Sequence, residues 1–440
     1  MQLWSVTRTS RRRNLTLTFG VLQFRIMGDP PPEAWKRVQR YASWMHRVHV
    51  DDRSALGEDT FRKLRLNSPV GGWFPALQDL SWIITDSNLP HADLFFSPHL
   101  KKVTISVSWS WGESDISHDT LANTTSTIHA LPAAALQILV IGLPPRGVPW
   151  AEFKEPLSSL VLRCGQSLTE LTSPAPLSDA ATTHLIQLPH LHTWFTAGSP
   201  PNFPSLSSPL VFPPLVQLTL WDSAACGWLC LFEQLEHVIP TARGLGPLSR
   251  MKESLRILNI KRLYDFTIDV SFTSPIHLFR NLISLNVGAR CRDEDGNDRC
   301  VFKLNDNSAT KLAMALPQME SLFLGHPCSK NTCVTTVACL LQISTHCIKL
   351  RNLVIHFNTT NIVNDLKSIS LDPQFQLLRS LPRCTLSRLG VYLTPLTLDE
   401  PGLETVAHGM IDIFPSLGYC EGLADTWDDI SERISKLQGL

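Results

Sequence analysis

The sequence has almost no excess charge and no long hydrophobic run. Lys and Arg number 39 and Asp and Glu number 39, so the formal net charge is +0 at pH 7. A nucleic-acid-binding protein usually carries a basic patch large enough to shift this balance. The longest span without a charged residue, 180–221, is interrupted by prolines and polar residues, whereas a membrane helix needs about 20 predominantly apolar residues. We therefore expect a soluble protein whose partners include neither nucleic acid nor membrane.

Catalytic and cofactor motifs are missing as well. The chain contains no phosphate-loop signature, no dinucleotide-binding glycine fingerprint, no Gly-x-Ser-x-Gly elbow and no His-Glu-x-x-His. Its 11 cysteines lack paired short spacings and follow no secretory signal, a usage typical of buried thiols in a reducing compartment. We therefore predict a cytoplasmic or nuclear protein that is not an enzyme and holds no cofactor.

Two short clusters could in principle hold a metal ion. DEDGND, residues 293–298, has carboxylates at alternate positions, but Gly296 stands at the fourth place and Leu304 replaces the bidentate acid of a calcium loop. A solvated acidic loop is the better interpretation. The second cluster has soft ligands whose spacing suits zinc poorly and favours buried thiols; it comprises His326, Cys328, Cys333, Cys339, His346 and Cys347. We predict no metal site.

What the sequence does contain is a recurring phrase, Leu-x-x-Leu-x-Leu. It occurs in FPALQDLSW from Phe74, in FPPLVQLTLW from Phe212 and in KLRNLVIHF from Lys349. The copies recur at a mean spacing of roughly 31 residues, as a repeat architecture requires. Their first positions are Leu77, Leu100, Leu136, Leu168, Leu191, Leu215, Leu255, Leu282, Met319, Leu350 and Leu386, and a degraded twelfth copy follows Phe414.

The spacing of the phrase predicts which side chains are buried. In a leucine-rich repeat, positions one, four and six enter the core, and the residues between them lie on the concave face. Residues 308–318 and 333–347 have apolar residues at helical spacing, which predicts helices between successive strands. We therefore predict an α/β fold, an irregular leucine-rich-repeat solenoid (horseshoe) with parallel strands on the concave face and helices or loops on the convex face. The alternative is that Leu-x-x-Leu-x-Leu is simply a common apolar pattern and not a repeat, which the presence of eleven copies disfavours.

The usual asparagine at position nine occurs only once, at Asn358, so we expect irregular curvature. We divide the chain into an N-terminal extension (1–30), a helical lead-in or cap (31–73), about eleven repeats (74–417) and a C-terminal capping helix (418–440). The extension is rich in Arg and poor in acids, which is also typical of a mitochondrial transit peptide. Its alternation around Thr16 and Thr18 favours a strand.

The candidate binding surface consists of the residues at positions three and five of the repeats, because these point away from the core. They are small, polar and of mixed charge, which suits hydrogen bonding to a protein segment better than binding of phosphates. Two tryptophans after the second repeat, Trp109 and Trp111, are either a lateral cap of the core or a binding anchor. The residues at positions three and five are Asp79, Ser81, Lys102, Thr104, Glu170, Thr172, Gln217, Thr219, Ser284, Asn286, Asn352 and Arg388.

Three segments carry a family resemblance: WKRVQRYASWMHRVHV from Trp35, FPALQDLSWII from Phe74 and LFFSPHLKKVTIS from Leu94. With the later phrases, they resemble the leucine-rich-repeat region of the F-box-like families of mushroom-forming (basidiomycete) fungi, over roughly residues 35–417. QLWSV, from Gln2, is similar to the phrase that closes an F-box, so the extension resembles an F-box remnant. The F-box helices themselves are largely missing from this chain.

This resemblance implies a substrate-receptor subunit of an F-box-type cullin–RING ubiquitin ligase, whose repeats present a protein of unknown identity. Binding of the ligase adaptor is expected only if an F-box is encoded upstream. The alternative is a repeat scaffold for protein–protein interaction that has no ubiquitin role.

Overall fold

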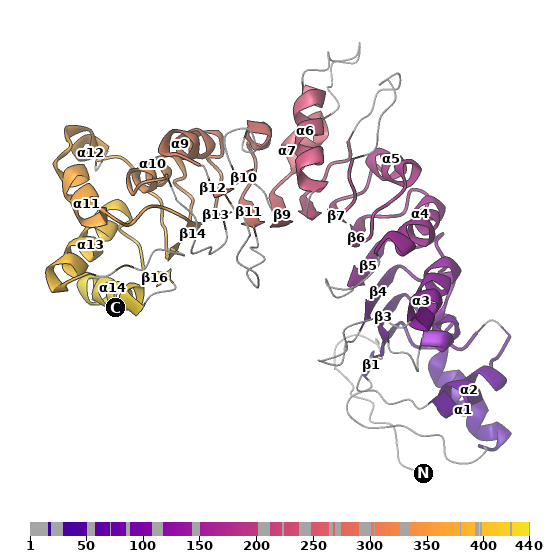
Figure 1. Ribbon diagram of the computed structural model, residues 1–440. Coiled ribbons are helices and arrows are strands. Elements are labelled where there is room, and N and C mark those ends of the chain that lie inside the picture. Colours follow the sequence, from indigo (N-terminus) through magenta and orange to yellow (C-terminus); the bar gives the residue numbers. More distant parts are fainter. Residues whose placement is uncertain are drawn as a thin grey trace. The chain divides into compact units, whose positions relative to one another are not determined.

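In the computed structural model, the chain forms two compact units, Met1–Leu206 and Ser207–Leu440 (Figure 1). Each unit is an α/β structure built on parallel strands. The structure describes residues 16–18, 30–50, 58–70, 72–84, 89–107, 118–142, 150–200, 212–221, 224–236, 248–263, 267–268, 274–289, 301–302, 304–325, 334–378, 380–391, 396, 398–422 and 425–439.

In the first unit, the strands pair in the order in which they occur in the chain. They are β1 (Thr16–Thr18), β2 (Arg47–Val50), β3 (Asp79–Ile84), β4 (Lys102–Val107), β5 (Ile138–Gly142), β6 (Glu170–Thr172) and β7 (Thr193–Thr196). The helical segments between them are α1 (Pro32–Ala42), α2 (Glu58–Leu66), η1 (Leu89–Phe95), α3 (His118–Ala130), η2 (Trp150–Phe153), α4 (Lys154–Arg163) and α5 (Asp179–Gln187). Helix α4 packs between α3 and α5, and the three form a layer on one side of the strands (Figure 1).

The second unit repeats this plan. Its main strands are β8 (Gln217–Trp221), β9 (Ile257–Leu263), β11 (Ser284–Ala289), β13 (Ser321–Leu324), β14 (Asn352–Ile355), β15 (Arg388–Val391) and β16 (Tyr419–Gly422). A separate parallel pair joins β10 (Thr267–Ile268) to β12 (Val301–Phe302). The helical segments are α6 (Ala224–Glu236), α7 (Ser249–Ser254), η3 (Ser274–Leu278), α9 (Asp306–Ala315), α10 (Ala338–His346), α11 (Ile362–Leu371), α12 (Pro373–Leu378), α13 (Glu400–Ile413) and α14 (Asp425–Gln438).

The recurring phrase accounts for where the main strands begin. Each of the eleven phrases, and the degraded copy after Phe414, is followed by a strand that starts two residues after the first leucine-like position. All twelve of these first positions are 0% exposed. In the first copy, Leu77, Leu80 and Trp82 are all buried, whereas Asp79 and Ser81 between them are half-buried. The apolar phrase therefore fixes both the strand and the face that it buries.

The sheet of the first unit includes two strands before Phe74: one in the extension, which the alternation favoured, and one in the segment predicted to be a helical lead-in. Helix α1 lies in the lead-in as expected, but Arg47–Val50 form β2 and pair with β3. Thr16–Thr18 form β1, the strand that the alternation favoured, and pair with β2. The segment RVHV was missed because Met45 takes the place of the first leucine and Val48 and Val50 those of the later ones, although all three side chains are buried.

At the other end, the segment predicted to be a capping helix contains β16 as well as α14. Helix α14 covers β16: the buried Ser431 hydroxyl accepts a hydrogen bond of 3.3 Å from the Cys420 N–H. Trp427 of α14 is 1% exposed and lies over Gly422, where an added Cβ would be 2.3 Å from Trp427 Cδ1. Gly422 stands at position six of the phrase, so the tryptophan of α14 occupies the space that a strand side chain fills elsewhere.

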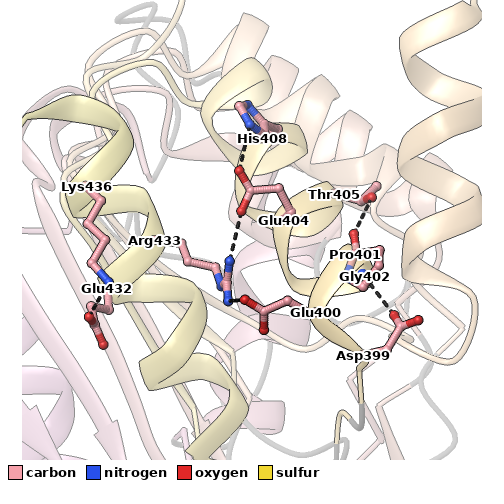
Figure 2. Close-up of polar contacts among 10 residues, drawn as sticks. All are labelled: Asp399, Glu400, Pro401, Gly402, Glu404, Thr405, His408, Glu432, Arg433 and Lys436. Atoms are coloured by element: carbon pink, nitrogen blue, oxygen red, sulfur yellow. Dashed lines mark hydrogen bonds and ion pairs between the residues drawn. The ribbon is translucent and has the colours of Figure 1, made fainter.

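Ion pairs connect α14 to α13 (Figure 2). The Arg433 guanidinium reaches from α14 to two carboxylates of α13, bonding Glu400 and, with Nη1 at 2.9 Å from Oε2, Glu404. Glu404 also contacts His408 Nε2 at 3.1 Å. Hydrogen bonds to these carboxylates raise the pKa of Arg433. Because both carboxylates are exposed and Arg433 is only partly buried, solvent screens these ion pairs and they contribute little to stability.

Candidate protein-binding face

The strand register brings the predicted surface residues of the first unit into two rows. Cα pairing aligns position three of each strand with position three of the next, and position five with position five. We call the face that carries these rows the open face of the unit. The first row is Arg47, Asp79, Lys102, Ile138, Glu170 and Thr193, and the second is His49, Ser81, Thr104, Val140, Thr172 and Phe195.

The open face of the second unit is built in the same way. Its position-three row is Gln217, Ile257, Ser284, Ser321, Asn352, Arg388 and Tyr419. Its position-five row is Thr219, Asn259, Asn286, Phe323, Val354, Gly390 and Glu421. All twelve residues that the sequence placed at positions three and five therefore lie in the rows of the two units. One of them, Thr219, is only 4% exposed and contributes little surface.

Charges of opposite sign alternate on the open face of the first unit. Arg47 Nε lies 3.8 Å from Asp79 Oδ2, and Lys102 is the next member of that row, opposite Asp79. Glu170 stands further along the same row, opposite Ile138. An arrangement with balanced charges does not attract a strongly acidic or basic ligand, but it can select the register of a partner that has complementary charges.

The open face of the second unit has mostly amides, hydroxyls and apolar side chains. Asn259 Nδ2 donates to Thr219 Oγ1 over 3.3 Å, which orients the amide along the row. Phe323 follows Asn286 in the position-five row and is half-buried. Such a mixture of oriented hydrogen-bonding groups and a partly exposed ring is typical of protein-binding surfaces.

One ion pair borders this surface. Arg388 Nη2 lies 2.6 Å from Glu421 Oε1 and 2.8 Å from Oε2, and Arg388 Nε lies 3.1 Å from Oε1. This bidentate contact fixes the orientation of the guanidinium plane between β15 and β16. Arg388 is thus held in place by Glu421, a residue that the sequence interpretation did not include.

Sequence reasoning missed the apolar members of the rows, and it also left out the polar Thr193, Asn259 and Ser321. Counting to positions three and five from each first leucine-like residue would have found the apolar members, because these positions are apolar in several strands. They are Ile138, Val140, Phe195, Ile257, Phe323 and Val354.

Other residues singled out in the sequence have different outcomes. Trp109 and Trp111, the acidic stretch 293–298, and His326, Cys328 and Cys333 lie outside the described residues. Cys339 and His346 belong to α10, and Cys347 follows it. Within the described ranges, no group of His, Cys, Asp or Glu side chains could hold a metal ion. Asn358 does not form a polar ladder: it is exposed, and its Oδ1 accepts from the N–H of Thr360 in its own loop at 2.9 Å.

The cysteines that the structure describes are free thiols, and all but Cys230 are buried. Burial raises the pKa of Cys164, Cys347 and Cys420 to about 12 and that of Cys384 to about 11. These thiols stay protonated at neutral pH, which makes them poor nucleophiles and poor metal ligands. They act as small apolar groups of the core.

Comparison with known proteins finds no family model that matches the chain and no matching curated protein. Among the helices of the described ranges, none has the length and apolar character needed to cross a membrane.

Proposed function

We propose that the chain is an irregular leucine-rich-repeat protein whose open faces bind a protein partner. The observation that supports this most is the register: leucine-like residues at position one are 0% exposed, while positions three and five form rows on the opposite face. A rigid sheet with aligned polar and apolar side chains suits recognition of a protein segment.

The resemblance to basidiomycete F-box-like proteins makes the proposal more specific. We propose that the partner is a substrate that the repeats present to a cullin–RING ubiquitin ligase, and that the protein acts by binding and not by catalysis. The alternative is a repeat scaffold without a ubiquitin role. The genomic sequence upstream of Met1 distinguishes the two. An in-frame F-box, together with retention of purified ligase adaptor by the protein that includes it, supports a receptor, and the absence of an F-box favours a scaffold.

Proximity labelling in cells, with one matched pair of variants, tests binding at the open face. Asn352 is exposed in the position-three row of the second unit, and Asn364 is exposed on α11 of the same repeat. Asn352→Arg places a long charged side chain among the row residues, whereas Asn364→Arg places it on a helix. We expect the first variant to lose labelled proteins that the wild type and the second variant retain. Identical labelling by all three would contradict binding at this face.

A further inference from the structure

Helix α1 and the turn after it expose a compact group of basic and aromatic side chains. We call the group the α1 patch; it comprises Lys36, Arg37, Arg40, Tyr41 and Trp44. Tyr41 is 57% exposed and Trp44 is 46% exposed, although large aromatic side chains are usually buried. The patch is set apart from the rows of the open face, because it belongs to a helix and not to the strands.

The opposite side of α1 is fixed to the core. Trp35 and Ala42 are buried, and the Trp35 ring packs 5.6 Å from that of Trp73, centroid to centroid. Trp73 in turn donates its indole N–H to the Leu64 carbonyl at 2.8 Å. The exposed side chains therefore project from a helix that is anchored to its unit.

Contacts within the patch hold its side chains in place. The Arg40 guanidinium carbon lies 5.4 Å from the centroid of the Trp44 ring, and the Tyr41 and Trp44 rings meet edge to face at 5.9 Å and 82°. The Ser43 hydroxyl donates to the Arg40 carbonyl at 2.8 Å, and the Trp44 N–H donates to the Tyr41 carbonyl at 3.1 Å. Side chains ordered before binding lose less conformational entropy when a partner arrives.

The patch has an excess of positive charge. Lys36 pairs with Glu33 at 3.0 Å, and Glu33 is the one acidic residue of α1. Within the described part of the chain, no carboxylate forms an ion pair with Arg37 or Arg40. The charges available to a partner are therefore positive, and a complementary partner is acidic.

The chemistry of the patch favours a protein over other acidic partners. Trp, Tyr and Arg are the residues most enriched at protein-binding hot spots. One face of the Trp44 ring is already covered by Arg40, which leaves less ring surface for stacking on a nucleobase. The exposed side of α1 offers no Leu or Phe to insert into a bilayer, as interfacial helices do.

We propose that the α1 patch is a second docking surface, which binds an acidic protein segment carrying an apolar side chain. The acidic groups pair with Arg37 and Arg40, and the apolar side chain packs against the exposed edges of Tyr41 and Trp44. This surface would let the chain hold one protein through α1 while the open faces hold another.

Fluorescence anisotropy with the full chain and two labelled peptides tests the proposal. One probe is a peptide of about 15 residues in which Asp or Glu alternates with Leu. In the other probe, Asn and Gln replace the acidic residues. We expect the acidic peptide to bind at least about tenfold more tightly than the amide peptide, and to weaken as NaCl rises. Arg37→Glu with Arg40→Glu, and separately Trp44→Ala, should each weaken binding of the acidic peptide by about tenfold.

Two control variants are matched for charge and exposure. Lys367→Glu reverses an exposed charge on α11, and Ile348→Ala removes a large apolar side chain after α10 that is 46% exposed, as Trp44 is. Both should bind the acidic peptide as the wild type does. Equal binding of the two peptides, or unchanged affinity in the α1 variants with unchanged thermal unfolding, would overturn the proposal. So would tighter binding of phosphatidylserine vesicles or a single-stranded oligonucleotide through the same side chains.

Discussion

Replacing Gly422 by alanine tests how the last strand is closed off from solvent. The added Cβ would lie 2.3 Å from Trp427 Cδ1 and 2.7 Å from Trp427 Cγ, and also 2.8 Å from the Val391 carbonyl oxygen. Neither neighbour can move freely, because Trp427 is 1% exposed and Val391 is paired with Gly422 in the sheet. Overpacking of a core costs about 1–3 kcal/mol of folding stability. Because the added methyl group also meets backbone, which cannot rotate away, we expect Gly422→Ala to cost about 3 kcal/mol.

Gly418→Ala is the matched control. Its Cβ would meet only the Ser387 carbonyl oxygen, at 3.6 Å, which is an ordinary contact distance. For a unit of this size, about 3 kcal/mol lowers the thermal midpoint by about 6–12 °C, whereas we expect little change for Gly418→Ala. Calorimetry of the full chain measures the shift, and amide hydrogen exchange shows whether β15 and β16 open first.

A double-mutant cycle separates the two contacts of the added methyl group. In a Trp427→Ala background the ring is gone, so Gly422→Ala should cost less than it does in the wild type, with the clash against Val391 remaining. If Gly422→Ala shifts the midpoint no more than Gly418→Ala does, α14 does not close the sheet in the way described.

Two further predictions concern the thiols. A maleimide, followed by peptide mass spectrometry, should label Cys230 rapidly in the native protein, and the buried thiols only after addition of urea; rapid native labelling of the buried set would contradict their placement. Burial holds the folded-state pKa of Cys164, Cys347, Cys384 and Cys420 above the ordinary 9.0, so the stability from the neutral thiols is present below pH 9 and is lost as pH rises towards 12. Urea unfolding at about pH 8 and about pH 10.5 should show this loss of stability, and the loss should be smaller in Cys420→Ala. A loss of the same size in Cys420→Ala would refute the assignment of the effect to the buried thiols. The buried set is Cys164, Cys339, Cys347, Cys384 and Cys420.

The sequence predicted the strands well because one local rule governs them. Leucine at position one, followed by alternating apolar residues, selects a strand and its buried face without reference to distant residues. Helices α9 and α10 were predicted for the same reason, since each has its apolar residues at helical spacing. Strand β2 was not recognised as a copy of the phrase because Met45 replaces the first leucine and valines replace both later ones.

Features that depend on contacts between separate helices and strands could not be predicted from the sequence. Gly422 looks like a break in the pattern until Trp427 is seen to fill its place. The pairing of Arg388 with Glu421 joins residues of neighbouring strands, and nothing in either strand alone indicates it. The apolar members of the rows were within reach of the sequence, because counting from the first leucine-like position locates Phe323 as surely as it locates Asn286.

Site-specific photo-crosslinking tests the proposed binding face most directly. A benzophenone amino acid in place of Ser321 projects from the position-three row of the second unit. The same group in place of Met314, which is 60% exposed, projects from α9, the helix that precedes β13. The account predicts that a protein captured in cells crosslinks to the Ser321 position and not to the Met314 position. Crosslinking from Met314 alone, or equally from both positions, would contradict recognition at the open face.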